Sequence, residues 1–260
     1  MEFDGTYVWA ANFDANTVTK LRSSDGVVVG AFETGERPSD LAFDGSHIWV
    51  LNFRSRDVSC LNAADGSLVG TFSITSSPAQ AAIQDEFLWV TTWSIGGLTK
   101  LRLSDGALIA TLDQPLDPSG IVYEASTSSL WIAKATGGLV KMDPVSGTVL
   151  AEYPVGVRNS DLAFDGTHLW VVDYSRVAKV RPSDGGILGT FSVGSDAQCI
   201  AVVGSSIWVA SRDRKLIELR ASDGSLVGTH VLNSEPLDLL YDGSNLWFSS
   251  WGRVTKIWLP

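Results

Sequence analysis

The sequence predicts an all-β protein: a single β-propeller domain over residues 1–260, with seven four-stranded blades. Three observations predict this fold. A tryptophan recurs every 38 to 42 residues, short apolar runs bounded by turn residues fill each repeat, and no segment of ten or more residues has a helical apolar period. The repeat tryptophans are Trp9, Trp49, Trp89, Trp131, Trp170, Trp208 and Trp247.

The second repeat shows why each element is expected. Residues 38–43, 47–52, 57–62 and 68–72 are short runs rich in β-branched and aromatic side chains, which is typical of strands. Asp-Gly pairs follow the first and third runs, and this dipeptide favours tight hairpin turns. Because each blade buries both faces against its neighbours, we expect the repeat tryptophan to lie between blades, where its burial contributes roughly 2–3 kcal/mol.

The number of blades follows from the ends of the repeat array. Residues 3–5 match the end of a first strand, and residues 254–258 match a third strand, which gives 26 expected strands. This predicts seven blades, the first without its first strand and the last without its fourth. The alternative of six blades needs 24 strands and leaves two over. An unpaired strand edge invites association, so self-association through these terminal blades is a further expectation.

Composition excludes several classes of partner. The formal net charge of −10 argues against nucleic acid and anionic membranes, whose phosphates attract lysine and arginine. No run of about 20 apolar residues is present, so membrane insertion is not expected. No signal peptide is visible after Met1. The two cysteines, Cys60 and Cys199, are far apart and form no CxxC motif, so neither indicates a metal or redox site.

The loops differ between the two ends of the strands. Those joining first to second and third to fourth strands are mostly uniform Asp-Gly turns, whereas those joining second to third strands, and one blade to the next, vary in length and chemistry. Loops carry function on a uniform scaffold, so the varied face is the candidate binding face.

One position on the varied loops has a recurrent chemistry. Four residues after the repeat tryptophan, five of seven copies are aromatic and one is arginine. Exposed aromatic side chains bind proteins, sugars or cations, and packing of these rings against neighbouring blades is the alternative. The candidate ligand-binding residues here are Phe13, Phe53, Trp93, Tyr174, Arg212 and Trp251.

The third position of the first strand carries aspartate in three repeats: Asp40, Asp161 and Asp238. We include these residues in the candidate ligand-binding set. Carboxylates gathered at a channel mouth could bind a divalent cation such as calcium, which takes six or more oxygen ligands. The alternative is that they cap N–H groups where the strands begin. No EF-hand pattern supports calcium, so no cofactor is expected.

Catalytic motifs are lacking in the sequence. The chain has three histidines, and neither a GxSxG nor an HExxH pattern occurs. His47 and His168 share one repeat position on the uniform side. We therefore expect a non-catalytic protein.

The motifs resemble a known repeat family. Residues 7–12 read Tyr-Val-Trp-Ala-Ala-Asn, a Thr-Val strand follows at 17–18, and residues 35–38 form a Gly-x-x-Pro linker. This pattern resembles the YVTN β-propeller repeats, which are related to NHL and streptogramin-lyase propellers. The resemblance implies a WD40-like propeller fold and a prokaryotic envelope or extracellular location. Lyases of that kind use a metal held by His and Glu, and this chain has no histidine at the matching first-strand positions.

The sequence predicts a recognition module that binds a carbohydrate or protein partner on the varied face. One alternative is a metal-dependent lyase- or hydrolase-like enzyme. The other is a structural surface or scaffold repeat protein.

Overall fold

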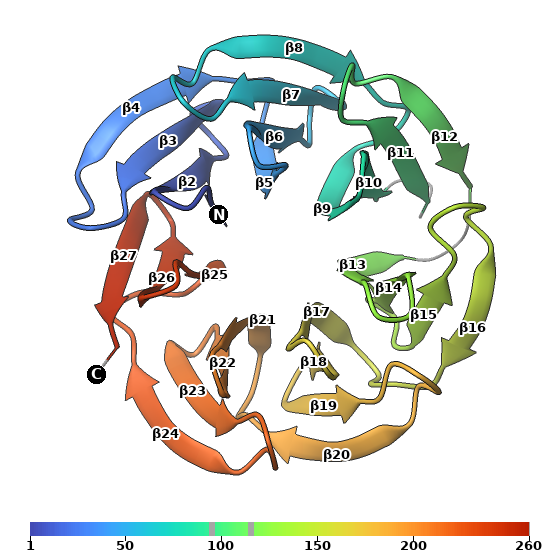
Figure 1. Ribbon diagram of the computed structural model, residues 1–260. Helices are drawn as coiled ribbons and strands as arrows, with labels where there is room; N and C mark the ends of the chain where they lie inside the picture. Colours follow the sequence, from blue (N-terminus) through green and yellow to red (C-terminus); the bar gives the residue numbers. More distant parts are fainter. Residues whose placement is uncertain (94–96, 114–116, 260) are drawn as a thin grey trace. The chain divides into compact units, whose positions relative to one another are not determined.

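The computed structural model of this protein describes residues 1–93, 97–113 and 117–259 (Figure 1). These residues form strands and turns without any helix, so none of the described segments is a helix able to cross a membrane. The strands form seven antiparallel sheets, which confirms the predicted all-β propeller of seven blades. The chain divides into two compact units, Met1–Pro118 and Ser119–Pro260. That the two units belong to a single domain stays a prediction.

The first unit contains blades 1 to 3. Its strands are β1 (Glu2–Phe3), β2 (Tyr7–Asn12), β3 (Thr17–Arg22), β4 (Val28–Glu33), β5 (Pro38–Phe43), β6 (His47–Asn52), β7 (Asp57–Asn62), β8 (Leu68–Ser73), β9 (Pro78–Gln84), β10 (Phe87–Thr92), β11 (Leu98–Arg102) and β12 (Leu108–Leu112). Within each blade the strands pair in sequence order. The expectation that blade 1 lacks its first strand is wrong, because β1 pairs with β2, with Phe3 opposite Val8. This strand has only two residues, and the sequence matches only the end of a first strand there.

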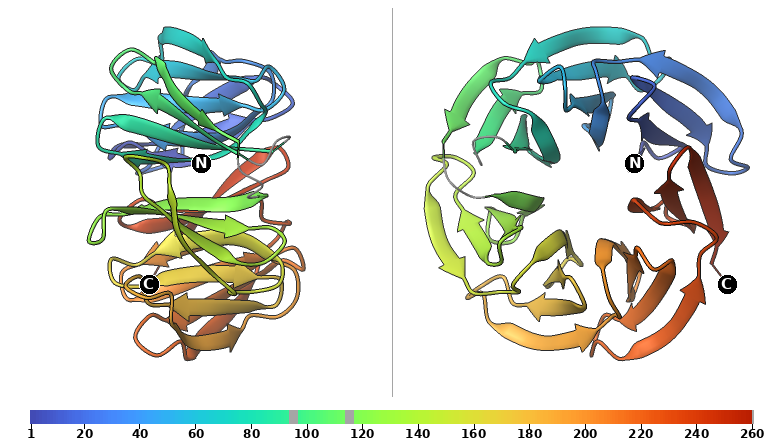
Figure 2. Two further views of the ribbon diagram at one scale, coloured as in Figure 1. Left: turned by 90° about the vertical axis from the view of Figure 1, so that its right-hand side faces the viewer. Right: turned by 180° about the vertical axis from the view of Figure 1, so that it is seen from behind.

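The second unit contains blades 4 to 7. Its strands are β13 (Pro118–Glu124, of which Pro118 belongs to the first unit), β14 (Ser129–Lys134), β15 (Leu139–Met142), β16 (Val149–Tyr153), β17 (Asn159–Phe164), β18 (Leu169–Asp173), β19 (Arg176–Val180), β20 (Ile187–Ser192), β21 (Ala197–Val203), β22 (Ser206–Ser211), β23 (Lys215–Arg220), β24 (Leu226–Val231), β25 (Asp238–Tyr241), β26 (Asn245–Ser250) and β27 (Arg253–Trp258). Blade 7 has three described strands, as predicted. The first strands β17, β21 and β25 contact one another in turn, and β20 and β24 lie on the outside (Figure 1). The strands of each unit run between two faces on which the loops collect (Figure 2).

Alternating side chains of a second strand pack in two different layers. Trp49 and Leu51 pack with residues of blade 3, whereas Ile48 and Val50 pack with residues of blade 1. Successive side chains of a strand point to opposite faces, so a strand between two blades needs apolar residues at consecutive positions. This explains the continuous apolar run that follows His47.

The aspartate of the first hairpin turn has two roles. In blade 2, Asp44 Oδ1 accepts the backbone N–H groups of Ser46 and His47, and its Oδ2 accepts the indole N–H of Trp49 at 2.8 Å. The same indole bond is made by Asp4, Asp165 and Asp242 in blades 1, 5 and 7. Burial opposes ionisation of Asp44, but the bonds from Trp49 and the turn outweigh it and hold the pKa of this carboxyl below its ordinary value.

Several adjacent blades within a unit are joined by a repeated contact, which we call the interblade lock. In this contact, a lysine of the third strand and an aromatic ring of the fourth strand belong to one blade. Both pack against the turn that joins the third and fourth strands of the next blade. Lys20 Nζ donates to the carbonyl oxygens of Ala63 and Ala64 at 2.6 and 3.0 Å. The ring of Phe32 lies tilted beside Trp9 and covers Gly66, where a Cβ atom would lie 2.1 Å from the ring. Only glycine therefore fits that turn position.

The lock recurs in the second unit. Lys179 Nζ donates to Ala221 O and Ser222 O at 2.6 and 3.0 Å, and the Phe191 ring covers Gly224. Blade 4 closes on blade 5 in the same way, through Lys141, Tyr153 and Gly185. In each of these three locks, the turn of the following blade fills the space beside the third strand.

Candidate functional site

The varied loops are held to the connections between blades by backbone hydrogen bonds. In the first unit Phe53 N donates to Arg37 O at 2.9 Å, and Trp93 N donates to Ser77 O at 3.0 Å. In the second unit Arg212 N donates to Asp196 O at 3.0 Å. The two kinds of varied loop therefore share one surface in each unit, which we call the loop face.

On the loop face of the first unit, Phe13 and Phe53 form an aromatic pair with ring centroids 6.4 Å apart. The guanidinium carbon of Arg37 lies 5.1 Å from the Phe13 centroid, within cation–π range. Both rings are partly buried, so they are partly loop anchors, as the alternative interpretation expects. Arg54 Nε pairs with Glu36 at 3.1 Å beside them. Trp93 differs, since 57% of its surface is exposed.

The loop face of the second unit repeats this chemistry. Tyr174 is 43% exposed and lies beneath Arg158, whose guanidinium carbon is 5.6 Å from the ring centroid. Trp251 is 69% exposed. Arg212 is exposed and pairs with Glu235 at 3.4 Å. The six predicted loop residues thus lie at equivalent positions in two groups of three, one group in each unit.

The three predicted aspartates make backbone contacts. Asp40 Oδ2 accepts the N–H of Ala81 at 3.0 Å, and Asp161 Oδ2 accepts that of Ile200 at 3.1 Å, in each case from the first strand of the next blade. Asp238 Oδ1 accepts the N–H of Leu239. Ala81 and Ile200 lie inside β9 and β21 rather than at their starts, so Asp40 and Asp161 join successive first strands within a unit. Ligand binding by the three aspartates stays a prediction. Over the described ranges, no group of three or more His, Cys, Asp or Glu side chains is arranged to hold a metal ion.

The two thiols are buried. Burial, and then the carboxylates of Asp238 and Asp161, raise the pKa of Cys199 well above its ordinary value. Burial together with Asp44 raises the pKa of Cys60 to about 12. Both thiols stay protonated at neutral pH, and a thiol is a poor nucleophile compared with a thiolate.

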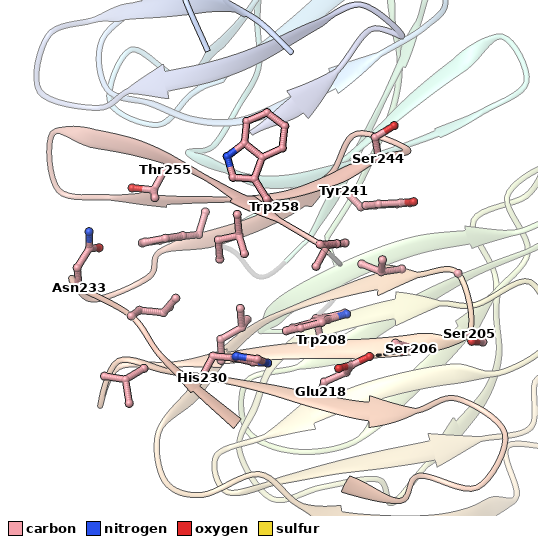
Figure 3. A pocket seen from close by; sticks show the side chains of 18 residues that line it. Ser205, Ser206, Trp208, Glu218, His230, Asn233, Tyr241, Ser244, Thr255 and Trp258 are labelled. Carbon is pink, nitrogen blue, oxygen red and sulfur yellow. Dashed lines mark hydrogen bonds between the residues drawn. The ribbon is translucent and has the colours of Figure 1, made fainter. Parts of the chain in front are cut away.

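A cavity of about 760 Å³ lies between blades 6 and 7 (Figure 3). Its walls include Trp208, Phe248 and Trp258, and its polar groups include Glu218 and His230. The His230 ring stacks on Trp208 at 5.5 Å, and Glu218 Oε1 accepts the Ser206 hydroxyl at 2.6 Å. In the strand pairing Glu218 faces Gly228 and Leu216 faces His230, so the two polar side chains are diagonal neighbours on one face.

Glu218 and His230 are candidate functional residues that the sequence analysis did not single out. Glu218 occupies the third-strand position that holds lysine in five of the other six blades, namely Lys20, Lys100, Lys141, Lys179 and Lys256. His230 occupies the position of the lock aromatic. Alignment of the third and fourth strands between repeats, rather than of the loops, would have revealed both departures.

Comparisons with known proteins identify the fold. No protein-family model and no curated protein matches the sequence. Among solved structures, the chain is similar to Kuenenia stuttgartiensis hydrazine synthase, with a TM-score of 0.85 and 14% identity over 98% of this chain and 93% of that chain. It is also similar to the WD40 β-propeller domain of Doa1, with a TM-score of 0.81 and 15% identity over 98% and 90%. A chain of the mitotic checkpoint complex gives a TM-score of 0.87 and 14% identity over 98% and 84%. At these identities the likeness shows a β-propeller fold alone.

Proposed function

We propose that this protein is a non-catalytic recognition module that binds a protein partner through its loop face. The observation that carries the proposal is a contrast in exposure between two positions four residues apart. The repeat tryptophans Trp89 and Trp247 are buried, whereas Trp93 and Trp251 are among the most exposed aromatic residues of the described chain. Burial of a large aromatic ring is favourable by roughly 2–3 kcal/mol, and an exposed ring gains this free energy only when a partner surface covers it.

A protein partner suits the composition of the loop face better than a sugar does. Arginine lies over or beside aromatic rings at Phe13 and Tyr174. Aromatic residues and arginine are enriched at the energetic centres of protein interfaces. Arg54 forms an ion pair with Glu36, and Arg212 forms one with Glu235. These charged pairs correspond to the polar rim that surrounds the centre of a protein interface.

The similar structures are compatible with this proposal. One of them belongs to an assembly, the mitotic checkpoint complex, and another is a WD40 propeller domain. The proposal extends to the finer assignment that the motifs imply, which is a YVTN-type propeller acting at the cell envelope or outside the cell.

A displayed library of random peptides and a glycan array test the proposal. Peptides selected on the immobilised protein should lose at least tenfold in affinity on Trp93→Ala or Trp251→Ala, because hot-spot aromatics contribute about 2 kcal/mol or more. Trp258→Ala is the control, since Trp258 is 70% exposed but lies at the far end of β27 from the loop face. Equal affinity for the loop variants refutes the assignment of the surface. Binding of glycans alone refutes the protein partner.

A further inference from the structure

Arg37 has a backbone conformation that arginine seldom adopts. Its φ is +56°, in the left-handed region, although proline favours extended backbone in the residue before it and Pro38 follows directly. Two hydrogen bonds hold this backbone. Arg37 N donates to Asn16 Oδ1 at 2.9 Å, and Arg37 O accepts the N–H of Phe53 at 2.9 Å. Arg37 is thus fixed between the varied loops of blades 1 and 2.

The backbone alone does not call for arginine at this position. Two other residues that come last before a first strand, Asp117 and Asp196, have φ of +43° and +59°. Aspartate, asparagine and glycine adopt this conformation more readily than other residues do. A strained conformation that is kept by a less suitable residue points to a function of its side chain.

The side chain of Arg37 is positioned without being paired. Its guanidinium carbon lies 5.1 Å from the ring centroid of Phe13, and the residue is exposed. Within the described ranges it forms no ion pair: Glu36 pairs with Arg54 instead, and Asp14, next to Phe13, forms none. A cation over a ring needs no N–H hydrogen bond to be held there, and guanidinium has five N–H donors. These donors remain available to a ligand.

The second unit has a similar arrangement that is built in a different way. Arg158 is also the last residue before a first strand, and its guanidinium carbon lies 5.6 Å from the ring centroid of Tyr174. Asp173 Oδ1 accepts the backbone N–H groups of Val157 and Arg158 at 3.2 and 3.0 Å. The Arg158 guanidinium forms no ion pair with any described residue. Each unit therefore presents an exposed arginine that is held over a ring and lacks a carboxylate.

We propose that Arg37 and Arg158 each bind a carboxylate of the partner, which is a protein segment with an acidic residue among apolar ones. The inference rests on the proposed function, because it names the chemistry that the loop face recognises. Guanidinium donates two parallel hydrogen bonds to a carboxylate, which fixes its position as well as its charge. The rings of Phe13 and Tyr174 offer apolar surface to the residues beside the acidic one.

A carboxylate suits these sites better than a phosphate does. A phosphorylated side chain carries almost two negative charges at neutral pH and is usually bound by several arginines. Each ring holds one arginine, and the neighbouring pair of Arg54 and Glu36 has no net charge. The net charge of −10 also opposes a polyanion. The segment therefore has isolated acidic residues rather than an acidic run.

Selection of displayed short peptides on the whole immobilised protein tests the proposal. The peptides recovered should be enriched in Asp and Glu relative to the unselected library, with apolar residues beside them. Replacing the required acidic residue of a peptide by its amide should weaken binding at least about tenfold, because a charge-assisted pair becomes a neutral contact.

Three arginine variants locate the interaction. Each acidic peptide should lose at least about tenfold in affinity on Arg37→Asn or on Arg158→Asn. Arg56→Asn is the matched control, because Arg56 is exposed, has a φ of +57° and belongs to the same varied face, but lies over no ring in the described chain. It should cost less than about threefold. Combining the sensitive variant with the amide peptide should cost no more than either change alone.

Arg37→Asn also separates binding from folding. Asparagine adopts left-handed backbone more readily than arginine does, so the urea midpoint of unfolding should not fall while binding is lost. A structural role for Arg37 predicts a lower midpoint instead, and that result would overturn the assignment of this residue.

The inference and the proposed function fail in different ways. If no recovered peptide responds to Trp93→Ala or Trp251→Ala, the loop face is not the binding surface and both fail. If peptides respond to these variants but lack an acidic preference and bind Arg37→Asn and Arg158→Asn normally, the proposed function stands and the acidic partner is refuted. Binding that tightens at least about tenfold when phosphoserine replaces the acidic residue assigns the arginines to phosphate and also refutes it.

Discussion

The repeat tryptophans of blades 4 and 5 form a natural matched pair for measuring one hydrogen bond. Trp131 and Trp170 are both fully buried, and each has a lysine Nζ 5.2 Å from its ring centroid. They differ at the indole nitrogen. Trp170 Nε1 donates to Asp165 at 2.7 Å, whereas Trp131 Nε1 is buried and has no hydrogen-bond partner among the described residues. Substitution by phenylalanine should therefore have unequal effects.

The size of the difference follows from the two environments. Loss of the second indole ring costs both variants about 1–3 kcal/mol through the cavity it leaves. Trp170→Phe also removes a bond to a carboxylate, which contributes about 1.5–3 kcal/mol. Trp131→Phe instead removes an unsatisfied buried N–H, which relieves about 1–3 kcal/mol. We expect Trp131→Phe to be nearly neutral and Trp170→Phe to cost at least 2 kcal/mol more.

Urea denaturation followed by circular dichroism measures the free energy of unfolding of both variants. A shift in midpoint at an unchanged m-value reports stability. An Asp165→Ala variant, alone and combined with Trp170→Phe, closes a double-mutant cycle and isolates the bond. Equal costs for the two phenylalanine variants, within about 0.5 kcal/mol, would refute the reasoning, as would additivity in the cycle.

Two further predictions concern the turns. Gly66→Ala should destabilise the protein by more than about 2 kcal/mol, because it adds a clash with Phe32 to the cost of a positive φ. Gly45→Ala meets open space at φ +99° and should cost about 1 kcal/mol. Thermal unfolding of the two variants tests this, and equal shifts in the unfolding temperature would contradict it. Acid should destabilise the protein through Asp44 and Asp242, where burial is outweighed by bonds from the indole and turn N–H groups that lower the pKa. Because these folded-state pKa values lie below the ordinary 3.8, the stabilisation is present above about pH 4 and is lost as the pH falls through the lowered values. Asp44→Asn should flatten the dependence of the urea midpoint on pH between 5 and 3, and an unchanged slope would exclude this carboxyl as a cause.

The strands could be predicted because each one is specified locally. The expected runs at 38–43, 47–52 and 57–62 coincide with β5, β6 and β7, since Asp-Gly, Asn and Pro mark their ends. The strand β1 was not counted, because residues 3–5 match only the end of a first strand. The blade number was predicted correctly, because the repeat tryptophan fixes the position of a second strand in every blade.

The roles of the polar side chains could not be predicted, because they depend on atoms from the neighbouring blade. Asp40 and Asp161 accept N–H groups about 40 residues away in the sequence. Nothing in the local sequence distinguishes such an acceptor from a metal ligand. Trp93 and Trp251 are exposed, as the prediction of a binding surface on the varied loops expects. Phe13 is partly buried, as the alternative of rings packed against neighbouring blades expects.

A departure from the repeat is informative when its structural partner departs as well. Cys60 replaces the lock lysine in blade 2, yet the Phe72 ring still covers Gly106 of blade 3, so the rest of that lock is retained. The substitution at Cys60 is absorbed by an apolar layer, in which this residue is buried. Glu218 departs together with His230, and both line the cavity between blades 6 and 7. The paired change gives this contact between blades a different chemistry, whereas the single change at Cys60 leaves the rest of its lock intact.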